Sequence, residues 1–199
     1  MKDHHLYNNF LYDIEADTLL NYLKANVPWT QVKYFKPERG YIVSPRLTWV
    51  AGLHSEPSCS SEQIISNAIP ELLVPVKALI ESHLDTKFNI VLFSCYRNEN
   101  DSANYNFDLN EHATTASLIL GGSRPLVLKG KSAKTFNLRH GDLFVMKHKP
   151  KKKSSYAIPK QTKECLPFYS ITFTKSLNID NCRNYYFYNL GLPIKNNIQ

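Results

Sequence analysis

Residues 89–96 read Asn-Ile-Val-Leu-Phe-Ser-Cys-Tyr, and this short apolar run is the first of several in the second half of the chain. The other runs cover residues 115–120, 126–129, 143–146 and 169–174. Glycines at 121, 122, 130 and 141 fall between them. Because regularly spaced short apolar runs separated by turn residues are typical of all-β folds, this half of the chain is predicted to form a β-sandwich or jelly roll.

The first half of the chain has helical periodicity. Apolar residues recur at helical spacing between Glu15 and Asn26, and again from about Ile69 to His83. Pro70 is suited to the first turn of the second segment. The sequence therefore predicts two packing helices that precede the strands, with loops over residues 55–61, 98–110 and 147–155.

Size and composition indicate one domain. The chain has 199 residues, of which 43% are hydrophobic and 21% charged, which is enough for one buried core. No stretch approaches the roughly 20 apolar residues of a membrane span, and the first residues lack the apolar run of a secretory signal. We therefore expect an intracellular protein of the nucleus or cytoplasm, without a membrane partner and with free thiols at its scattered cysteines.

The charge balance favours polyanionic partners. Twenty-four Lys and Arg residues against seventeen Asp and Glu residues give a formal net charge of +7. Such an excess attracts DNA or RNA without specifying sequence or affinity. Charge alone is weak support, because many basic proteins bind no nucleic acid.

Residues 89–96 resemble the strand that opens the catalytic jelly roll of the AlkB-type nucleic-acid demethylases, which are Fe(II)- and 2-oxoglutarate-dependent dioxygenases. Asn89 and Tyr96 match an Asn and a Tyr that help to hold 2-oxoglutarate in that family. Segments similar to the family's other strands, turns and lid follow in consistent order, at residues 45–49, 117–124, 138–146, 158–159 and 169–174.

The resemblance spans about Leu6 to Ser176 and implies a single α+β domain, mainly β: a double-stranded β-helix (jelly roll) with N-terminal packing helices. We take residues 1–176 as this domain. Residues 177–199, with four consecutive aromatics at Tyr185–Tyr188, are predicted to be an aromatic C-terminal extension packed on it.

The metal-binding positions of the family are altered. The family binds Fe(II) through a His-x-Asp pair and a distal His, a facial triad that leaves positions open for cosubstrate and oxygen. The His-x-Asp position is here Asn106-Phe107-Asp108, and the distal His position is Tyr156. An amide is a poor iron donor, and a phenol with an ordinary pKa of about 10 would have to ionise.

The cosubstrate-binding positions are altered too. Two Arg residues of the family that bracket the last strand fall on Phe168 and Thr174. Replacing each Arg removes charge-assisted hydrogen bonds worth roughly 1.5–3 kcal/mol. The resemblance therefore predicts a pseudoenzyme with no catalytic residue, no metal site and no cofactor. The alternative is an active Fe(II)/2-oxoglutarate-dependent demethylase with altered metal ligands.

Other histidines are weaker candidates for metal binding. His140-Gly141-Asp142 is a literal His-x-Asp, but the resemblance places it in a structural turn. His112 and His148 are expected on loops. An unusual iron site that combines Asp108 with one of these histidines is the form that the active alternative would take.

Nucleic-acid binding is the leading functional hypothesis, or service as a scaffold in DNA repair or RNA modification. Candidate contacts are Arg46 and Trp49 on the lid and a basic loop with Lys149, Lys151, Lys152 and Lys153. Basic side chains attract phosphates, and exposed aromatics stack on bases. The plain alternatives are a solvated loop, aromatic side chains that fill the old pocket, and a module that binds a protein partner.

Overall fold

The computed structural model describes residues 4–36, 40–52, 67–107, 114–129, 133–147 and 155–175, without the side chains of 34–36, 104–107 and 155. Two helices and twelve strands occur in this part of the chain, in the order β1 His4–Tyr7, α1 Asp13–Asn26, β2 Lys33–Lys36, β3 Gly40–Val43, β4 Leu47–Gly52, α2 Leu73–Leu84, β5 Ile90–Tyr96, β6 Ala103–Phe107, β7 Thr114–Gly121, β8 Arg124–Lys129, β9 Lys134–Leu138, β10 Leu143–Lys147, β11 Ser155–Ile158 and β12 Phe168–Thr174.

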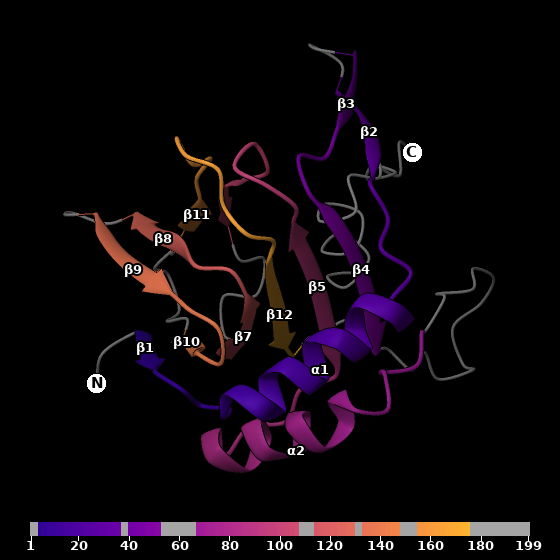
Figure 1. The fold of residues 1–199 in the computed structure, drawn as a ribbon, viewed down its shortest axis with the longest axis vertical. Helices are drawn as coiled ribbons and strands as arrows, with labels where there is room; N and C mark the ends of the chain where they lie inside the picture. Colours follow the sequence, from indigo (N-terminus) through magenta and orange to yellow (C-terminus); the bar gives the residue numbers. More distant parts are fainter. Residues whose placement is uncertain are drawn as a thin grey trace, which may run out of the picture.

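Most strands belong to two antiparallel sheets. The major sheet has the order β1-β10-β7-β12-β5-β4, and the minor sheet has the order β6-β11-β8-β9. A separate hairpin, β2–β3, projects from the end of the molecule near β4 (Figure 1). Apart from the β8–β9 hairpin, neighbouring strands in both sheets are far apart in sequence, so the fold depends on long-range pairing.

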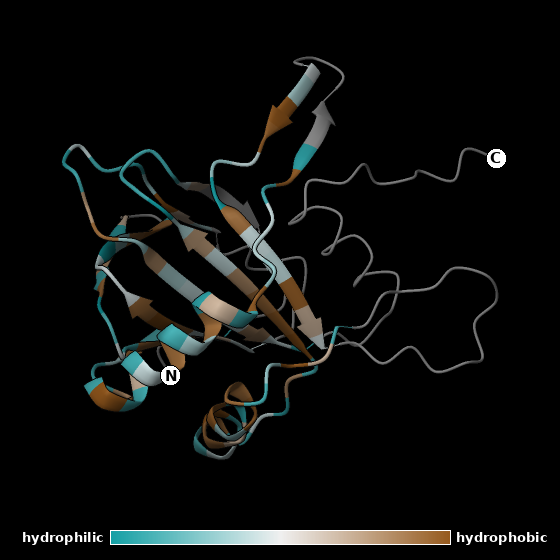
Figure 2. Ribbon diagram, turned by 45° about the vertical axis from the view of Figure 1, so that its right-hand side comes forward, coloured by the Kyte–Doolittle hydropathy of each residue, from teal (hydrophilic) through white to brown (hydrophobic). Residues whose placement is uncertain are grey.

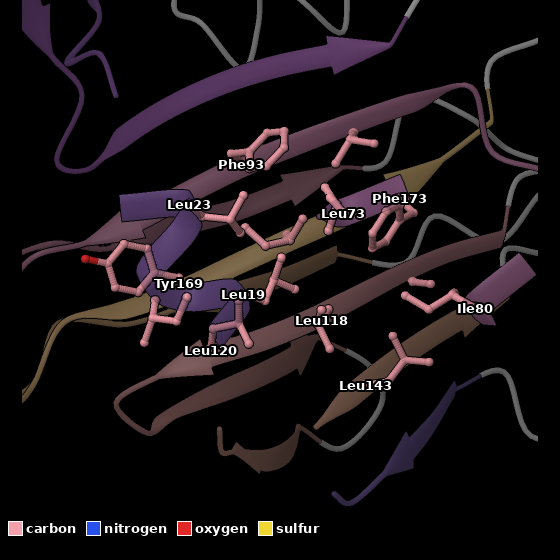
Figure 3. Packing of buried hydrophobic residues seen from close by; sticks show 14 of the residues in the cluster. Leu19, Leu23, Leu73, Ile80, Phe93, Leu118, Leu120, Leu143, Tyr169 and Phe173 are labelled. Carbon is pink, nitrogen blue, oxygen red and sulfur yellow. The ribbon is translucent and has the colours of Figure 1, made fainter. Parts of the chain in front are cut away.

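Both helices cover one face of the major sheet. Figure 3 shows Leu19 and Leu23 of α1, with Leu73 and Ile80 of α2, pointing onto the sheet. The sheet side chains that meet them alternate along the strands, as the two-residue period requires. They include Val91, Phe93 and Cys95 of β5, Leu118 and Leu120 of β7, and Ile171 and Phe173 of β12.

The alternate residues of the same strands form a second core between the two sheets. Tyr96, Ile119 and Phe168 of the major sheet belong to it, together with Leu126 and Ile158 of the minor sheet. Because each central strand is covered on both faces, most of its side chains are apolar, and Figure 2 shows these strands as mostly hydrophobic. Burying each large apolar side chain contributes about 1.5–3 kcal/mol.

The structure confirms the main predicted elements. Strands β5, β7, β8, β10 and β12 lie on the five apolar runs, and α1 and α2 lie on the two helical segments. Neither described helix has the length and apolar character that a membrane crossing requires.

Three local predictions were wrong. Residues 98–110 were expected to be a loop, but Ala103–Phe107 form β6, which pairs with β11. The helices were expected to precede the strands, but β1 precedes α1 and pairs with β10. Strands β2, β3 and β4 also lie between α1 and α2. Finally, α2 begins at Leu73, so Pro75 and not Pro70 lies in its first turn. In the two strand cases, pairing with a distant strand decided the conformation.

Candidate functional site between the two sheets

A small cavity lies between the two sheets. Its volume is about 20 Å³, which is room for one or two water molecules. Its apolar walls come from both sheets. Its polar lining consists of Arg46 and six hydroxyl side chains, those of Ser94, Tyr96, Ser117, Tyr156, Ser170 and Thr172.

Strand register explains why hydroxyls gather here. Ser94 of β5 pairs with Ser170 of β12, and Thr172 of β12 pairs with Ser117 of β7. Paired residues lie on the same face of a sheet, so the four side chains form a row across three strands. The Ser117 and Thr172 hydroxyls are hydrogen-bonded at 2.8 Å.

Two buried guanidinium groups flank Tyr96. The guanidinium carbons of Arg46 and Arg124 lie 5.9 Å and 5.4 Å from the Tyr96 ring centroid. Arg124 donates to the carbonyl oxygens of Asp101 and Asn98 and so anchors the loop after β5. Burial raises the pKa of the Tyr96 phenol, while the two arginines partly oppose this shift. Tyr96 is therefore a neutral hydroxyl at physiological pH.

The two altered His positions lie on neighbouring strands. Tyr156 of β11 is directly opposite Asn106 of β6 in the ladder, and its side chain lines the cavity. Asp108 lies outside the described residues. Within the described ranges, no three His, Cys, Asp or Glu side chains are grouped closely enough to hold a metal ion. The donors present at these positions do not match two imidazoles.

The two altered Arg positions are buried. Phe168 is fully buried, and its ring packs edge-on against Tyr96 with centroids 5.5 Å apart. Thr174 is also buried, at the other end of the same strand. Neither residue provides a positive charge for a carboxylate.

Of the other two cosubstrate candidates, only Tyr96 reaches the cavity. Asn89 precedes β5, is exposed, and uses its backbone N–H to donate to the Thr174 carbonyl oxygen. Ser94, five residues further along the chain, lines the cavity wall, whereas Asn89 does not. Sequence reasoning missed Ser94, although its even spacing from Tyr96 along an apolar strand was a usable signal.

His140 and Asp142 make structural hydrogen bonds in a turn. His140 Nδ1 accepts a hydrogen bond from the Gly121 backbone N–H at 2.8 Å. The buried Asp142 carboxylate accepts backbone N–H bonds from Asn9 and Arg139. These contacts tie the turn to β7 and to the N-terminal segment. His112 and His148 lie outside the described residues.

The two nucleic-acid candidates on the expected lid point to opposite sides. Trp49 of β4 packs on the helix side of the sheet, with its ring centroid 5.0 Å from that of Phe93. Arg46, in contrast, is buried and lines the cavity. Lys149, Lys151, Lys152, Lys153 and the predicted extension 177–199 lie outside the described residues.

The 2OG-Fe(II) oxygenase superfamily pattern matches residues 3–183. Alpha-ketoglutarate-dependent dioxygenase alkB homolog 3 from Mus musculus is 28% identical over 185 residues, and the Homo sapiens protein is 28% identical over 188 residues. Both alignments cover 84% of this chain and 64% of the relative. The chain thus spans about 64% of the length of these relatives.

Solved structures show the same fold. OsALKBH1 superposes with a TM-score of 0.61 and 14% identity, covering 87% of this chain and 98% of that one. A Pseudomonas putida prolyl-4-hydroxylase superposes with a TM-score of 0.56 and 10% identity, covering 88% of this chain and 94% of the other. The fold is therefore the predicted double-stranded β-helix.

The comparisons contradict the expectation of no cofactor. The matching superfamily is defined by 2-oxoglutarate and Fe(II), and the relatives are named as alpha-ketoglutarate-dependent enzymes. Fe(II) and 2-oxoglutarate are thus the cofactors to which the relatives of this chain point. The described donors at Tyr156, Phe168 and Thr174 still do not match the usual protein ligands of either group.

Proposed function

Since the chain belongs to the 2OG-Fe(II) oxygenase superfamily, we propose that it is an AlkB-like member that binds nucleic acid without catalysing oxidative demethylation. The opposed pair Asn106 and Tyr156 carries the proposal. A neutral amide and a phenol stand where the resemblance expects two imidazole ligands. Both are weaker donors to Fe(II) than imidazole, which supports a non-catalytic role.

The burial of Phe168 on β12 supports the same proposal. Phe168 occupies an expected Arg position and is fully buried against Tyr96. A ring packed in this way stabilises the core and gives a substrate carboxylate nothing to pair with. The changes at the metal positions and at the cosubstrate positions therefore agree.

Nucleic acid is the proposed partner because of charge and kinship. The formal net charge is +7, and the AlkB homolog 3 proteins are among the relatives. Lysines of the basic loop would contact phosphates, a mode of binding that does not depend on the metal site. DNA and RNA are both candidates.

Binding should be measured as fluorescence anisotropy of labelled single-stranded DNA and RNA over a salt series. We expect the logarithm of the binding constant to fall linearly with the logarithm of salt concentration. Replacing Lys149, Lys151, Lys152 and Lys153 by Gln should flatten that slope. Absence of binding at low salt, or binding that ignores salt, would remove the proposal.

A matched control distinguishes binding through residues 149–153 from general attraction by the net charge of the protein. Lys134, Arg139, Lys160 and Lys163 are exposed, and changing these four to Gln removes the same charge from other surfaces. We expect this control to keep most of the affinity. An equal loss in both quadruple variants would show diffuse attraction and would contradict a binding role for residues 149–153.

The second candidate is an active oxygenase with altered ligands. It is favoured by Tyr96, which keeps its place on the cavity wall, and by the family's dependence on Fe(II) and 2-oxoglutarate. This candidate predicts stoichiometric iron in protein purified without oxygen and succinate release from 2-oxoglutarate. Both results together would replace the non-catalytic proposal.

A further inference from the structure

The outward side of α2 is apolar although it is exposed. The inner side of this helix packs on the major sheet through buried Leu73 and Ile80 (Figure 3). Four exposed apolar residues, related by i, i+4 spacing, make up the outward side: Val74, Pro75, Ala78 and Leu79. We call these four residues the α2 face. Since a helix that is apolar all round is normally buried, the α2 face has the composition of a covered surface.

The exposure of the α2 face is large. Val74 is 52% exposed and Leu79 is 50% exposed. The helix lies at the outer edge of the molecule, beyond α1 (Figure 1). Within α2, which is described throughout, no exposed residue is an Asp, Glu, Lys or Arg. The α2 face is therefore an uncharged apolar surface over most of the helix.

The solvent side of α1 is different. Asp13, Asp17, Asn21 and Lys24 are exposed along it, as is usual for a surface helix. Ile14, which is 82% exposed, is the one exposed large apolar residue within α1, and single apolar residues on a surface are common. The apolar outward side is thus a property of α2 and not of both helices.

The C-terminal extension leaves the described part of the chain close to α2. The Thr174 carbonyl oxygen accepts a hydrogen bond from the Asn89 backbone N–H at 3.2 Å. The Phe173 ring centroid lies 6.1 Å from that of Phe88, and the Phe88 backbone N–H donates to Glu81 of α2 at 2.7 Å. The extension therefore starts beside the last turns of α2.

The extension contains a segment with matching chemistry. Residues 184–194 read Asn-Tyr-Tyr-Phe-Tyr-Asn-Leu-Gly-Leu-Pro-Ile and include no charged residue. Residues 176–183, which precede this segment, span up to about 26 Å when extended. The 12 residues of α2 make a helix about 18 Å long. The uncharged segment can therefore reach every part of the α2 face.

A second copy of the chain fits this surface less well. The outward side of a helix of this length is a strip about 18 Å by 10 Å, whereas each partner in a stable complex buries roughly 800 Å². A segment of the same chain needs less area, because its tether keeps it at an effective concentration in the millimolar range.

We propose that residues 184–194 of the extension dock on the α2 face, with the aromatic side chains of Tyr185–Tyr188 covering Val74 and Leu79. This contact makes the extension part of the domain and gives α2 apolar neighbours on both sides. The proposal does not rest on nucleic-acid binding. The two proposals can therefore fail separately, one in the anisotropy series and one in the assays below.

The first test is the rate at which a maleimide labels Leu79→Cys in the full chain, read by peptide mass spectrometry so that the native cysteines are counted apart. The same substitution is combined with an extension in which the four aromatics at 185–188 are changed to Ser. We expect the natural extension to slow labelling at position 79 at least about ten-fold, because a covered site reacts only when its cover opens.

Ile14→Cys is the matched control, because this exposed position lies on α1. Its labelling rate should be the same with either extension. Equal labelling of Leu79→Cys with both extensions would overturn the proposal. Protection that disappears on dilution would identify a second copy as the occupant and would overturn it as well.

A second measurement leaves the extension unchanged, so it holds even if the serine variant does not fold. Chymotrypsin cuts after aromatic residues, and Leu79→Glu places a charge on the α2 face without entering the core. We expect cutting at residues 185–188 to become at least about ten-fold faster in Leu79→Glu, whereas Ile14→Glu should be cut at the wild-type rate. Unchanged cutting in Leu79→Glu would show that the extension does not dock on α2.

Discussion

Asn106 of β6 and Tyr156 of β11 are directly opposite each other in an antiparallel ladder of the minor sheet. They are 50 residues apart in sequence, and only the pairing of the two strands brings them together. Directly opposed residues have Cβ atoms about 5 Å apart. Two imidazoles introduced at these positions would lie within reach of one ion.

The double variant Asn106→His, Tyr156→His should bind divalent metal at least about ten-fold more tightly than either single variant, because both imidazoles then act on one ion. Isothermal titration with Co(II) or Fe(II) under nitrogen measures this. The single variants are the controls. A double variant no tighter than the better single variant would mean that the two positions do not share an ion.

Phe168→Ala should destabilise the protein by about 3–5 kcal/mol, since it removes a fully buried ring and leaves a hole beside Tyr96. Urea unfolding at neutral pH measures the change. Leu166→Ala, two residues away and 75% exposed, should change stability by no more than about 0.5 kcal/mol. Equal effects at the two positions would argue against Phe168 as a core plug.

Stability should fall between pH 9 and pH 11 because of Cys95. Burial raises the pKa of this thiol from 9.0 to about 11. The unfolded chain therefore loses the thiol proton at a lower pH than the folded chain does. The stability that the neutral Cys95 thiol contributes is fully present below pH 9 and is lost as pH rises through the folded pKa. The loss is about 1.4 kcal/mol per pH unit over this range.

Cys95→Ser should reduce that alkaline loss by about 3 kcal/mol in total, because a serine hydroxyl does not titrate there. Urea midpoints from pH 8 to pH 11 measure it. The pKa of Tyr169 is also raised, by burial first and then by the neighbouring Cys95 thiol, so the part of its contribution that comes from burial should remain in both proteins. Parallel pH profiles for variant and wild type would contradict the role of Cys95.

Acid should weaken the protein through Glu81. Burial alone would raise the pKa of this carboxyl, but hydrogen bonds from Lys77, the Phe88 backbone N–H and Lys87 outweigh it and lower the pKa. The resulting stability is present at neutral pH and is lost as pH falls below 4.5 through the folded pKa.

Glu81→Gln should therefore cost about 1.5–3 kcal/mol at pH 7, with a gap to the wild type that narrows in acid. Unfolding midpoints at pH 7 and at pH 3 provide the comparison. Glu164→Gln, at an exposed position, is the matched control and should leave the unfolding midpoint unchanged at both pH values. A gap that stays constant with pH would show that charge at residue 81 does not contribute.

The sequence by itself determined the β-rich architecture and the chemical character of the altered positions. Apolar runs such as 90–96 predict their own strands, because a strand buried on both faces needs apolar side chains along its length. The residue types at 106, 156, 168 and 174 are likewise plain in the sequence once the order of the strands is aligned with the family.

Only the tertiary structure decided which side chains meet. The polar segment 103–107 becomes a strand because β11 pairs with it, and no local periodicity encodes that partner. Trp49 of β4 packs on the helix side of the major sheet, whereas Arg46, in the bend just before β4, lines the cavity on the other side. The register of β4 with β5 decides which side each residue meets. The hydroxyl row across β5, β12 and β7 depends on the same long-range register, so the polar cavity could be found only after the sheets were assembled.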